Sequence, residues 1–305
     1  MDTTATAEVE APRAEKSLFG GIAIMLTGAL SSQVGAATGA HAFPFIGPAG
    51  VVAVRQMVAA AVLVPIARPP YRRMTWAQWW PTLLLAAVFA VMNLSLYTAI
   101  DRIGLSLAVT LEFLGPLSVA LVGSRTRIDL VIAVAAGIGV YVLVLPGPSS
   151  DYLGLALALV AAGCWAAYIL LNRLLGTRLP GLQAPAAAAS VSALVYLPVL
   201  VVLIADGRMR GMPVLYALTA GVLSSAVPYA TDLIALRRVS ARFFGVFMSV
   251  NPVMAALAGI VLLGQTLDVH EWVGLAMVVS ANAVAVTLSR PRQTDALDDR
   301  AEVLT

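Results

Sequence analysis

The chain has 305 residues, of which 60% are hydrophobic and only 11% are charged, and its net charge is +3. A soluble domain carries about 25% charged residues, so this composition excludes an ordinary soluble protein and indicates a membrane protein. The 18 Arg and one Lys are scattered singly through short polar segments. This distribution argues against a nucleic-acid-binding patch and is typical of an orientation signal in a membrane protein.

Ten apolar segments follow one another along the chain, each near the roughly 20 residues that a helix needs to cross a bilayer. In chain order they are 18–40, 47–67, 78–100, 104–123, 128–146, 152–172, 182–204, 212–236, 241–263 and 270–289. Only 101–103 separates the third segment from the fourth, and only 237–240 separates the eighth from the ninth. Both pairs are therefore predicted to form tight hairpins. The sequence predicts an all-α membrane protein with ten transmembrane helices between polar tails at 1–17 and 290–305.

Positive charge lies almost entirely on one side of this predicted topology. Arg102, Arg208 and Arg210 fall in connections on the far side, and Arg55 falls inside the second span. Every other Arg, and the one Lys, belongs to a tail or connection on the side of the N-terminus. Since cytoplasmic loops of membrane proteins are enriched in Arg and Lys, both termini are predicted to be cytoplasmic.

The two halves of the chain resemble each other. Residues 97–121 align with 233–257 at an offset of 136, which pairs Pro116 with Pro252. The first copy crosses a hairpin whose turn faces outward, and the second crosses one whose turn faces inward. This pattern predicts two inverted five-helix repeats, at 18–146 (helices 1–5) and 152–289 (helices 6–10). Secondary transporters with such repeats bind substrate near the membrane midplane, between the repeats.

Apart from residues at the very ends of the segments, three residues that are charged in their ordinary state fall within predicted spans: Arg55, Glu112 and Asp232. Ionisable side chains in a membrane are costly and usually face a partner or a wet cavity. Arg55 and Glu112 each lie roughly 12 Å below the outer end of their helix, at 1.5 Å per residue. They are candidates to pair with each other, or to hold opposite ends of a zwitterion. Asp232 is a candidate for ion pairing or coupling, although solvation near the inner end of helix eight explains it equally well.

Three of the prolines inside predicted spans are expected to kink them near polar residues. Pro116, Pro228 and Pro252 have no N–H to bond the carbonyl groups of Glu112, Ser224 and Met248, four residues earlier. Carbonyl groups freed at this depth line a cavity or contact another helix.

Polar and aromatic side chains recur at helical spacing in several spans. The set comprises Asn93 and Tyr97 in helix three, Trp165 and Tyr168 in helix six, Ser225 and Tyr229 in helix eight, Gln33 in helix one and Asn251 in helix nine. A spacing of three or four places residues on one helix face. Together these side chains predict a substrate-binding cavity, while hydrogen bonding between helices explains any one of them alone.

Motifs of other function classes are absent from the sequence. There is no GxxxxGK[ST] phosphate loop, no HExxH and no GxSxG, and the chain has one cysteine, Cys164. No cofactor or metal is expected. An integral membrane enzyme is less favoured because only Arg55 and Glu112 share a depth, and a channel leaves no short motif by which to judge it.

The ten-span, two-repeat layout resembles the drug/metabolite transporter superfamily, with an EamA-type repeat in each half. The segments FPFIGPAGVVAVR (43–55), LEFLGPLSVAL (111–121), SSAVPYATDLIAL (224–236) and FFGVFMSVNPVMAAL (243–257) are similar to the bacterial inner-membrane threonine/homoserine exporter branch. The resemblance covers nearly all of residues 20–288.

This resemblance implies an inner-membrane secondary transporter that exports small amino acids or related polar metabolites by alternating access, driven by the proton-motive force or passively. Glu112 matches the branch's carboxylate. Asp232 and Asn251 depart from it, because the branch more often has glutamate there, and Asn251 thereby removes a candidate proton site. The implied partners are a small-molecule substrate, the lipid bilayer and protons, but no nucleic acid, with the protein a monomer or homodimer. The alternative is an exporter of amphipathic cations or drugs, which Trp165, Tyr168 and Tyr229 would bind through cation–π contacts.

Overall fold

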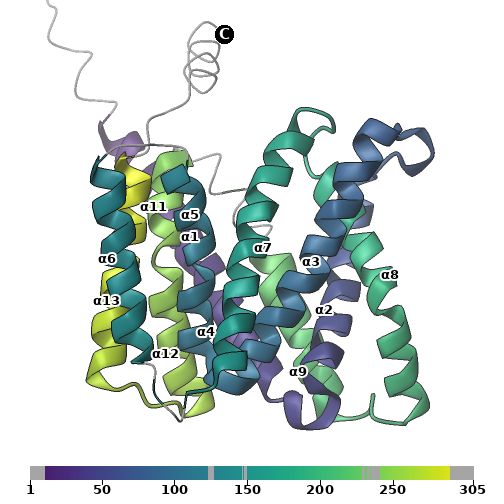
Figure 1. The fold of residues 1–305 in the computed structure, drawn as a ribbon. Coiled ribbons are helices and arrows are strands. Elements are labelled where there is room, and N and C mark those ends of the chain that lie inside the picture. The colour runs from purple at the N-terminus through teal and green to yellow at the C-terminus, as the bar shows by residue number, and fades with distance from the viewer. Residues whose placement is uncertain are drawn as a thin grey trace, which may run out of the picture.

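The computed structural model describes residues 11–122, 127–145, 147, 150–228, 231, 234 and 241–288, without the side chains of 11–19 and 241–243. Within these ranges the chain is a bundle of upright helices without a strand (Figure 1). One span each is formed by α1 (Ala11–Ala40), α2 (Phe43–Ala67), α3 (Trp76–Ile103), α6 (Arg127–Val144), α7 (Tyr152–Gly176), α8 (Gln183–Ala205) and α13 (Val269–Leu288), and a short 3₁₀ turn, η1 (Tyr71–Arg73), precedes α3.

The remaining spans are interrupted helices. The fourth consists of α4 (Leu105–Glu112) and α5 (Leu114–Val122), the eighth begins with α9 (Met212–Gly221) and a π-helical turn, η2 (Val222–Ala226), and the ninth consists of α11 (Ala241–Met248) and α12 (Asn251–Leu263). Each interruption lies within a few residues before a proline, namely Pro116, Pro228 or Pro252. The missing N–H groups of these prolines account for the lost continuity of the helical hydrogen bonds.

Nine apolar helical segments of the described chain are long enough to cross a membrane, with α4–α5 and α11–α12 counted as one each. The eighth span appears as the shorter stretch Met212–Ala226, and its continuation lies outside the described residues. Large apolar side chains such as Ile66, Val131 and Val261 are exposed, as expected of surfaces that face lipid. The predicted all-α membrane fold is confirmed for the part of the chain that the structure describes.

The predicted hairpin between the third and fourth spans turns at one residue. Gly104 separates α3 from α4 and has φ +84°, a conformation that residues with a Cβ atom rarely adopt. The predicted turn of the second hairpin, 237–240, lies outside the described residues.

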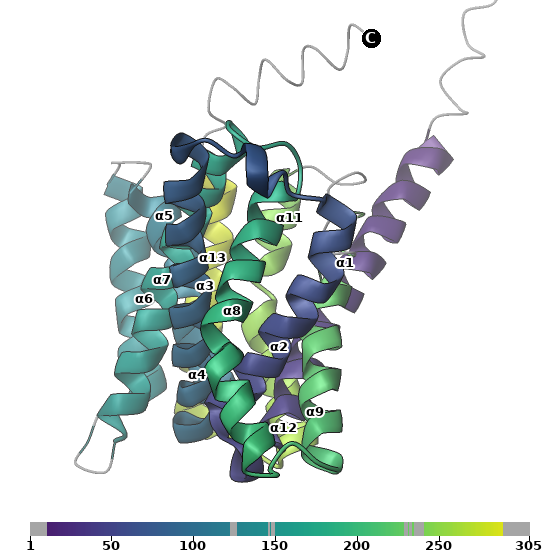
Figure 2. The same ribbon diagram turned by 90° about the vertical axis from the view of Figure 1, so that its right-hand side faces the viewer.

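Helices pack closely around the centre of the bundle. α3 packs along α7, α6 along α13, and α2 along α8, a pair seen side by side in Figure 2. Small residues allow this approach: a Cβ atom on Gly115 would lie 2.3 Å from the carbonyl oxygen of Ala162, so α5 contacts the backbone of α7 directly. This contact fixes Glu112, at the end of α4, close to the face of α7 that carries Trp165.

Candidate functional site

A cavity of about 220 Å³ lies at the centre of the bundle. Of the residues that the sequence singled out, it is lined by Gln33, Arg55, Asn93, Tyr97, Glu112, Trp165, Pro228 and Asn251. These side chains come from α1, α2, α3, α4, α7 and α12, and from the residues just after η2. Side chains from both halves of the chain therefore line one cavity.

Arg55 is held by neutral acceptors on two other helices. Its Nη1 donates to Asn93 Oδ1 at 2.6 Å, and its Nη2 donates to the carbonyl oxygen of Ser224 at 2.9 Å. Asn93 in turn donates its amide to the carbonyl oxygen of Phe89 at 2.8 Å, which directs Oδ1 toward the arginine. The guanidinium carbon lies 5.1 Å from the centroid of the Tyr97 ring, within the range of a cation–π contact.

The carbonyl group that binds Arg55 is free because of the π-helical turn and the proline that follows it. In η2 the N–H of Val227 bonds the carbonyl oxygen of Val222, five residues earlier. Pro228 would supply the donor to Ser224 in an α-helix or to Leu223 in a π-helix, and it has no N–H. The carbonyl oxygen of Leu223 accepts from a side chain instead, since the hydroxyl of Ser31 donates to it at 2.8 Å.

Helix α1 lies directly against this π-helical turn. The hydroxyl of Ser224 donates to the carbonyl oxygen of Ser32 at 2.8 Å. A Cβ atom on Gly35 would lie 2.3 Å from that same hydroxyl, so glycine is required for the approach. The turn in the second half of the chain is thus bound by α1 and α2 of the first.

Glu112 is 6% exposed and occupies the last position of α4, on the cavity wall. The next residue, Phe113, packs edge-on against Trp165 with ring centroids 4.6 Å apart. Among the described residues no group forms a hydrogen bond or an ion pair with the Glu112 carboxylate. Arg55 and Glu112 therefore line the same cavity without forming the direct ion pair that was one of their two predicted arrangements.

The break in the ninth span also contributes to the cavity wall. Asn251 donates its side-chain amide to the carbonyl oxygen of Met248 at 3.0 Å, the group left free by Pro252. Its Oδ1 accepts a hydrogen bond of 3.3 Å from Gln33 on α1. Both amide side chains are buried, and both line the cavity.

Four of the predicted site residues are not placed on the cavity wall. Tyr168 packs against Phe89, with ring centroids 5.6 Å apart, in an apolar cluster beside the cavity. Ser225 is buried in η2 but does not line the cavity. Tyr229 and Asp232 lie outside the described residues.

Several other residues that line the cavity were not predicted from the sequence. Ser32, Met92, Phe113 and Met248 line the cavity as well. Phe113 and Met248 could have been predicted, because each lies within a few residues before a proline near which its span is interrupted. Ser32 and Met92 carry none, since neither is distinguishable in sequence from the apolar and small residues around it.

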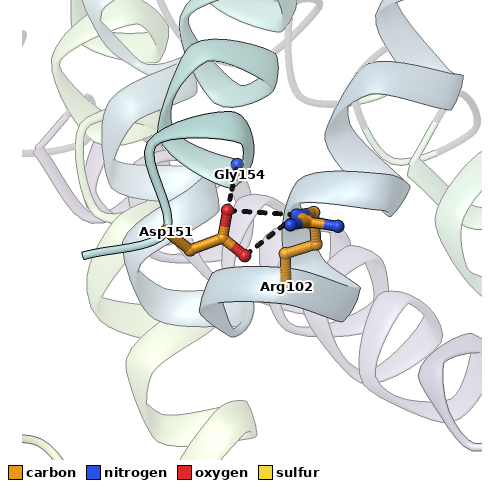
Figure 3. A network of polar contacts seen from close by, with 3 residues as sticks. All are labelled: Arg102, Asp151 and Gly154. Atoms are coloured by element: carbon orange, nitrogen blue, oxygen red, sulfur yellow. Dashed lines mark hydrogen bonds and ion pairs between the residues drawn. The ribbon is translucent and has the colours of Figure 1, made fainter. Parts of the chain in front are cut away.

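Polar contacts join the two halves at the end of the bundle where α3 ends and α4 begins. Gln265 follows α12, and its Oε1 accepts a hydrogen bond of 3.2 Å from the N–H of Leu105, at the start of α4. A Cβ atom on Gly259 would lie 2.4 Å from Gln265 Oε1, so the side chain fills the space between the helices. Nearby, Arg102 at the end of α3 forms an ion pair of 2.9 Å with Asp151, which caps α7 through the N–H of Gly154 (Figure 3).

One group of metal-ligating side chains occurs in the described chain, but it lies apart from the cavity. Asp268, His270 and Glu271 come together within 4.8 Å at the start of α13. Glu271 already accepts the N–H of Asp268 at 2.7 Å, as a helix-capping residue does. Among the described residues, the cavity wall contributes one carboxylate, Glu112, which does not make a metal-binding set.

Comparisons with known proteins agree with this architecture. The EamA-like transporter family matches residues 152–287. Threonine/homoserine exporter RhtA of Salmonella typhimurium (strain LT2) is 33% identical over 281 residues, covering 91% of this chain and 95% of that protein. The chain belongs to the EamA-like transporter family.

Further relatives of this EamA-like chain were found among sequences and solved structures. Threonine/homoserine exporter RhtA of Escherichia coli (strain K12) is 34% identical over 264 residues, covering 86% of this chain and 89% of that protein. An uncharacterized transporter, YwfM of Bacillus subtilis, is 24% identical and covers 72% of this chain. One crystal structure has a TM-score of 0.58 at 18% identity and covers 90% of this chain and 99% of that one, which shows a shared fold. The relatives with a stated activity are transporters, and the chain is a multi-pass membrane protein of that kind.

Proposed function

We propose that this protein exports small amino acids such as threonine and homoserine from the cytoplasm, binding them in the central cavity. One observation carries the proposal: a single cavity of about 220 Å³ presents a guanidinium and a carboxylate that do not pair with each other. A zwitterion brings one charge for each of them. Removing both charges of the substrate from water requires such compensation.

The volume of the cavity favours a small substrate over a drug-sized one. Pockets that hold drug-sized molecules enclose about 300–1,000 Å³, more than the 220 Å³ found here. The aromatic set proposed for cation–π binding is also dispersed, since Trp165 lines the cavity whereas Tyr168 packs against Phe89 beside it. The names of the RhtA relatives point to the same substrate class.

The proposed transport mechanism is alternating access between two inverted five-helix repeats, at 18–146 and 152–289, with both termini in the cytoplasm of a bacterial cell. Packing of equivalent spans supports the repeats: α2 lies on α8 and α6 on α13, the second on the seventh and the fifth on the tenth. Gln56 donates to Ser192 at 2.9 Å, and these residues are 136 positions apart, the offset at which the halves align. A twofold axis in the membrane plane would pass close to this pair.

Efflux from loaded cells tests this function. Cells that contain the protein should release preloaded threonine or homoserine faster than cells without it, and should tolerate more of either amino acid in the medium. Glu112→Gln should suppress this efflux at an unchanged protein level, whereas Glu271→Gln, in the first turn of α13 and apart from the cavity, should not. Efflux of these amino acids that is the same with and without the protein, together with expulsion of an amphipathic cation, would favour the drug-exporter alternative.

A further inference from the structure

We infer that the hydroxyl of Tyr97 and the Nε–H of Arg55 form the seat for the carboxylate of the transported substrate. This inference rests on the proposed function, because it assigns one end of the amino acid to named atoms. It is supported by a set of buried polar atoms that have no hydrogen-bond partner. In the part of the chain that the structure describes, three buried side-chain N or O atoms lack a hydrogen bond: Arg55 Nε, Tyr97 Oη and Ser106 Oγ.

Two of these three atoms belong to side chains that line the same cavity. Arg55 and Tyr97 are on its wall, whereas Ser106 is not. Buried polar groups in folded proteins are nearly always hydrogen-bonded, because an unmade bond costs free energy. Both orphan atoms belong to residues of one cavity wall, so an acceptor that binds in this cavity would satisfy them.

The geometry of Arg55 leaves its Nε edge for such an acceptor. Asn93 Oδ1 and the carbonyl oxygen of Ser224 occupy one hydrogen of each terminal nitrogen, at 2.6 Å and 2.9 Å, and fix the plane of the guanidinium. Its Nε–H and the remaining terminal hydrogens then form a planar fork, which matches the two oxygens of a carboxylate.

Tyr97 is fixed equally well beside this fork. Its side chain is 1% exposed, and its ring lies edge-on to Phe43 with centroids 5.9 Å apart. The guanidinium carbon of Arg55 lies 5.1 Å from its ring centroid. The Tyr97 ring is therefore held next to the guanidinium, and in this inference its hydroxyl donates to the anion that the arginine binds.

Charge identifies the missing acceptor as an anion. The two observed acceptors of Arg55 are neutral, and Glu112 forms no ion pair with it. An arginine inside a membrane protein is costly, and among the described residues Arg55 has no direct ion pair, so a bound carboxylate would supply one. The seat thus predicts substrates with a free carboxylate, and it predicts that the corresponding amides and amino alcohols bind poorly.

Competition in proteoliposomes that contain the full chain tests this seat. Uptake of labelled threonine by the wild-type protein should be inhibited by unlabelled threonine, and at least about ten-fold less strongly by threoninol, which lacks the carboxylate. Tyr97→Phe should weaken inhibition by threonine about ten-fold, as expected for the loss of a hydrogen bond to a charged group, and leave inhibition by threoninol unchanged. Ser106→Ala removes the orphan hydroxyl outside the cavity and should change neither. Equal weakening of both inhibitors by Tyr97→Phe, or no change in either, would overturn the seat.

A thermal-shift measurement separates this inference from the proposed function. Carboxylates that bind the seat should raise the melting temperature of the wild-type protein more than that of Tyr97→Phe. If the wild-type protein moves neither threonine nor homoserine but other carboxylates produce this Tyr97-dependent shift, the proposed function fails and the seat stands. If threonine is transported and raises the melting temperature of both proteins equally, the seat fails and the proposed function stands.

Discussion

Arg55 donates a 2.9 Å hydrogen bond to the carbonyl oxygen of Ser224, an acceptor that is available because Pro228 has no N–H to occupy it. The bond joins α2 in the first half of the chain to η2 in the second. Arg55 is thereby oriented at the cavity wall by a backbone atom of the opposite half. Several consequences of this arrangement can be measured.

Pro228→Ala should loosen Arg55. The new N–H can bond the carbonyl group of Ser224 or Leu223, so it competes with Arg55 or with Ser31 for an acceptor. Because the variant gains a helical hydrogen bond, we expect thermal stability in detergent to be retained or raised. The apparent KM for threonine efflux should rise several-fold, and a variant with wild-type KM would show that this bond does not position Arg55.

Exchanging the charges of Arg55 and Glu112 should not restore activity. The two side chains form no ion pair, and the partners of Arg55 are the oxygens of Asn93 and Ser224, which cannot donate to a carboxylate. Arg55→Glu and Glu112→Arg should each abolish efflux, and the double variant should remain inactive and unstable. Recovery of melting temperature and efflux in the double variant would mean that the two residues pair directly.

Gln265→Ala should loosen the contact between the two halves at the end of the bundle that we propose faces outward. It removes the acceptor for the N–H of Leu105 at the start of α4, and the loss of a comparable helix cap costs about 0.5–2 kcal/mol. We expect a lower melting temperature together with faster labelling, from outside, of a cysteine placed at Val109 on the cavity wall in a Cys164→Ala background. Gln265→Glu keeps an acceptor oxygen and serves as the control. Unchanged labelling would show that Gln265 stabilises the fold without closing the cavity.

Asp151 should contribute a pH-dependent part of the stability. The N–H of Gly154, and after it the guanidinium of Arg102, hold the pKa of Asp151 below its ordinary value. A lowered folded-state pKa means that the stabilisation is complete above the unfolded pKa of about 3.9 and is lost as pH falls through the folded pKa. Asp151→Asn should therefore lower the melting temperature by a few degrees at neutral pH, because an exposed pair contributes little. This difference should shrink as the solution is made more acidic than the folded pKa, and a difference independent of pH would contradict the assignment.

The orientation of the chain can be tested with single cysteines in a Cys164→Ala background. Asp206→Cys, at the end of α8, should react in intact cells with a thiol reagent that does not cross membranes. Thr177→Cys, at the end of α7, should react only after the membrane is opened. The reverse pattern would place both termini outside.

The spans were predictable because each depends on local information. About 20 apolar residues in succession specify a membrane helix whatever surrounds them, and a proline removes one backbone donor from its helix. The interruption at Phe113, between α4 and α5, lies three residues before Pro116, although Pro81 and Pro198 lie inside helices that are continuous. Arg55 and Glu112 could be placed at one depth by counting residues along their helices, and they do line one cavity.

Contacts between helices could not be predicted in the same way. Trp165 and Tyr168 are three residues apart on α7, and helical spacing assigns them to one face, yet Tyr168 packs on Phe89 beside the cavity. The rotation of α7 against its neighbours decides this, and it depends on close contacts such as that of Gly115 with Ala162. Likewise, the contact between Arg55 and Ser224 could not be predicted from side-chain types, because the acceptor is a backbone carbonyl group, which every residue has.

The last point has a consequence for mutational scans of this protein. Alanine at position 224 would remove a hydroxyl that donates to Ser32, but would leave the oxygen that binds Arg55 in place. An alanine scan through Val222–Ala226 would therefore not remove the carbonyl oxygen that accepts from Arg55, so it would not detect this hydrogen bond. A substitution at Pro228 would detect it, because it adds an N–H group to the backbone. The genetic signature of this contact is thus a loss of function caused by gaining a hydrogen-bond donor.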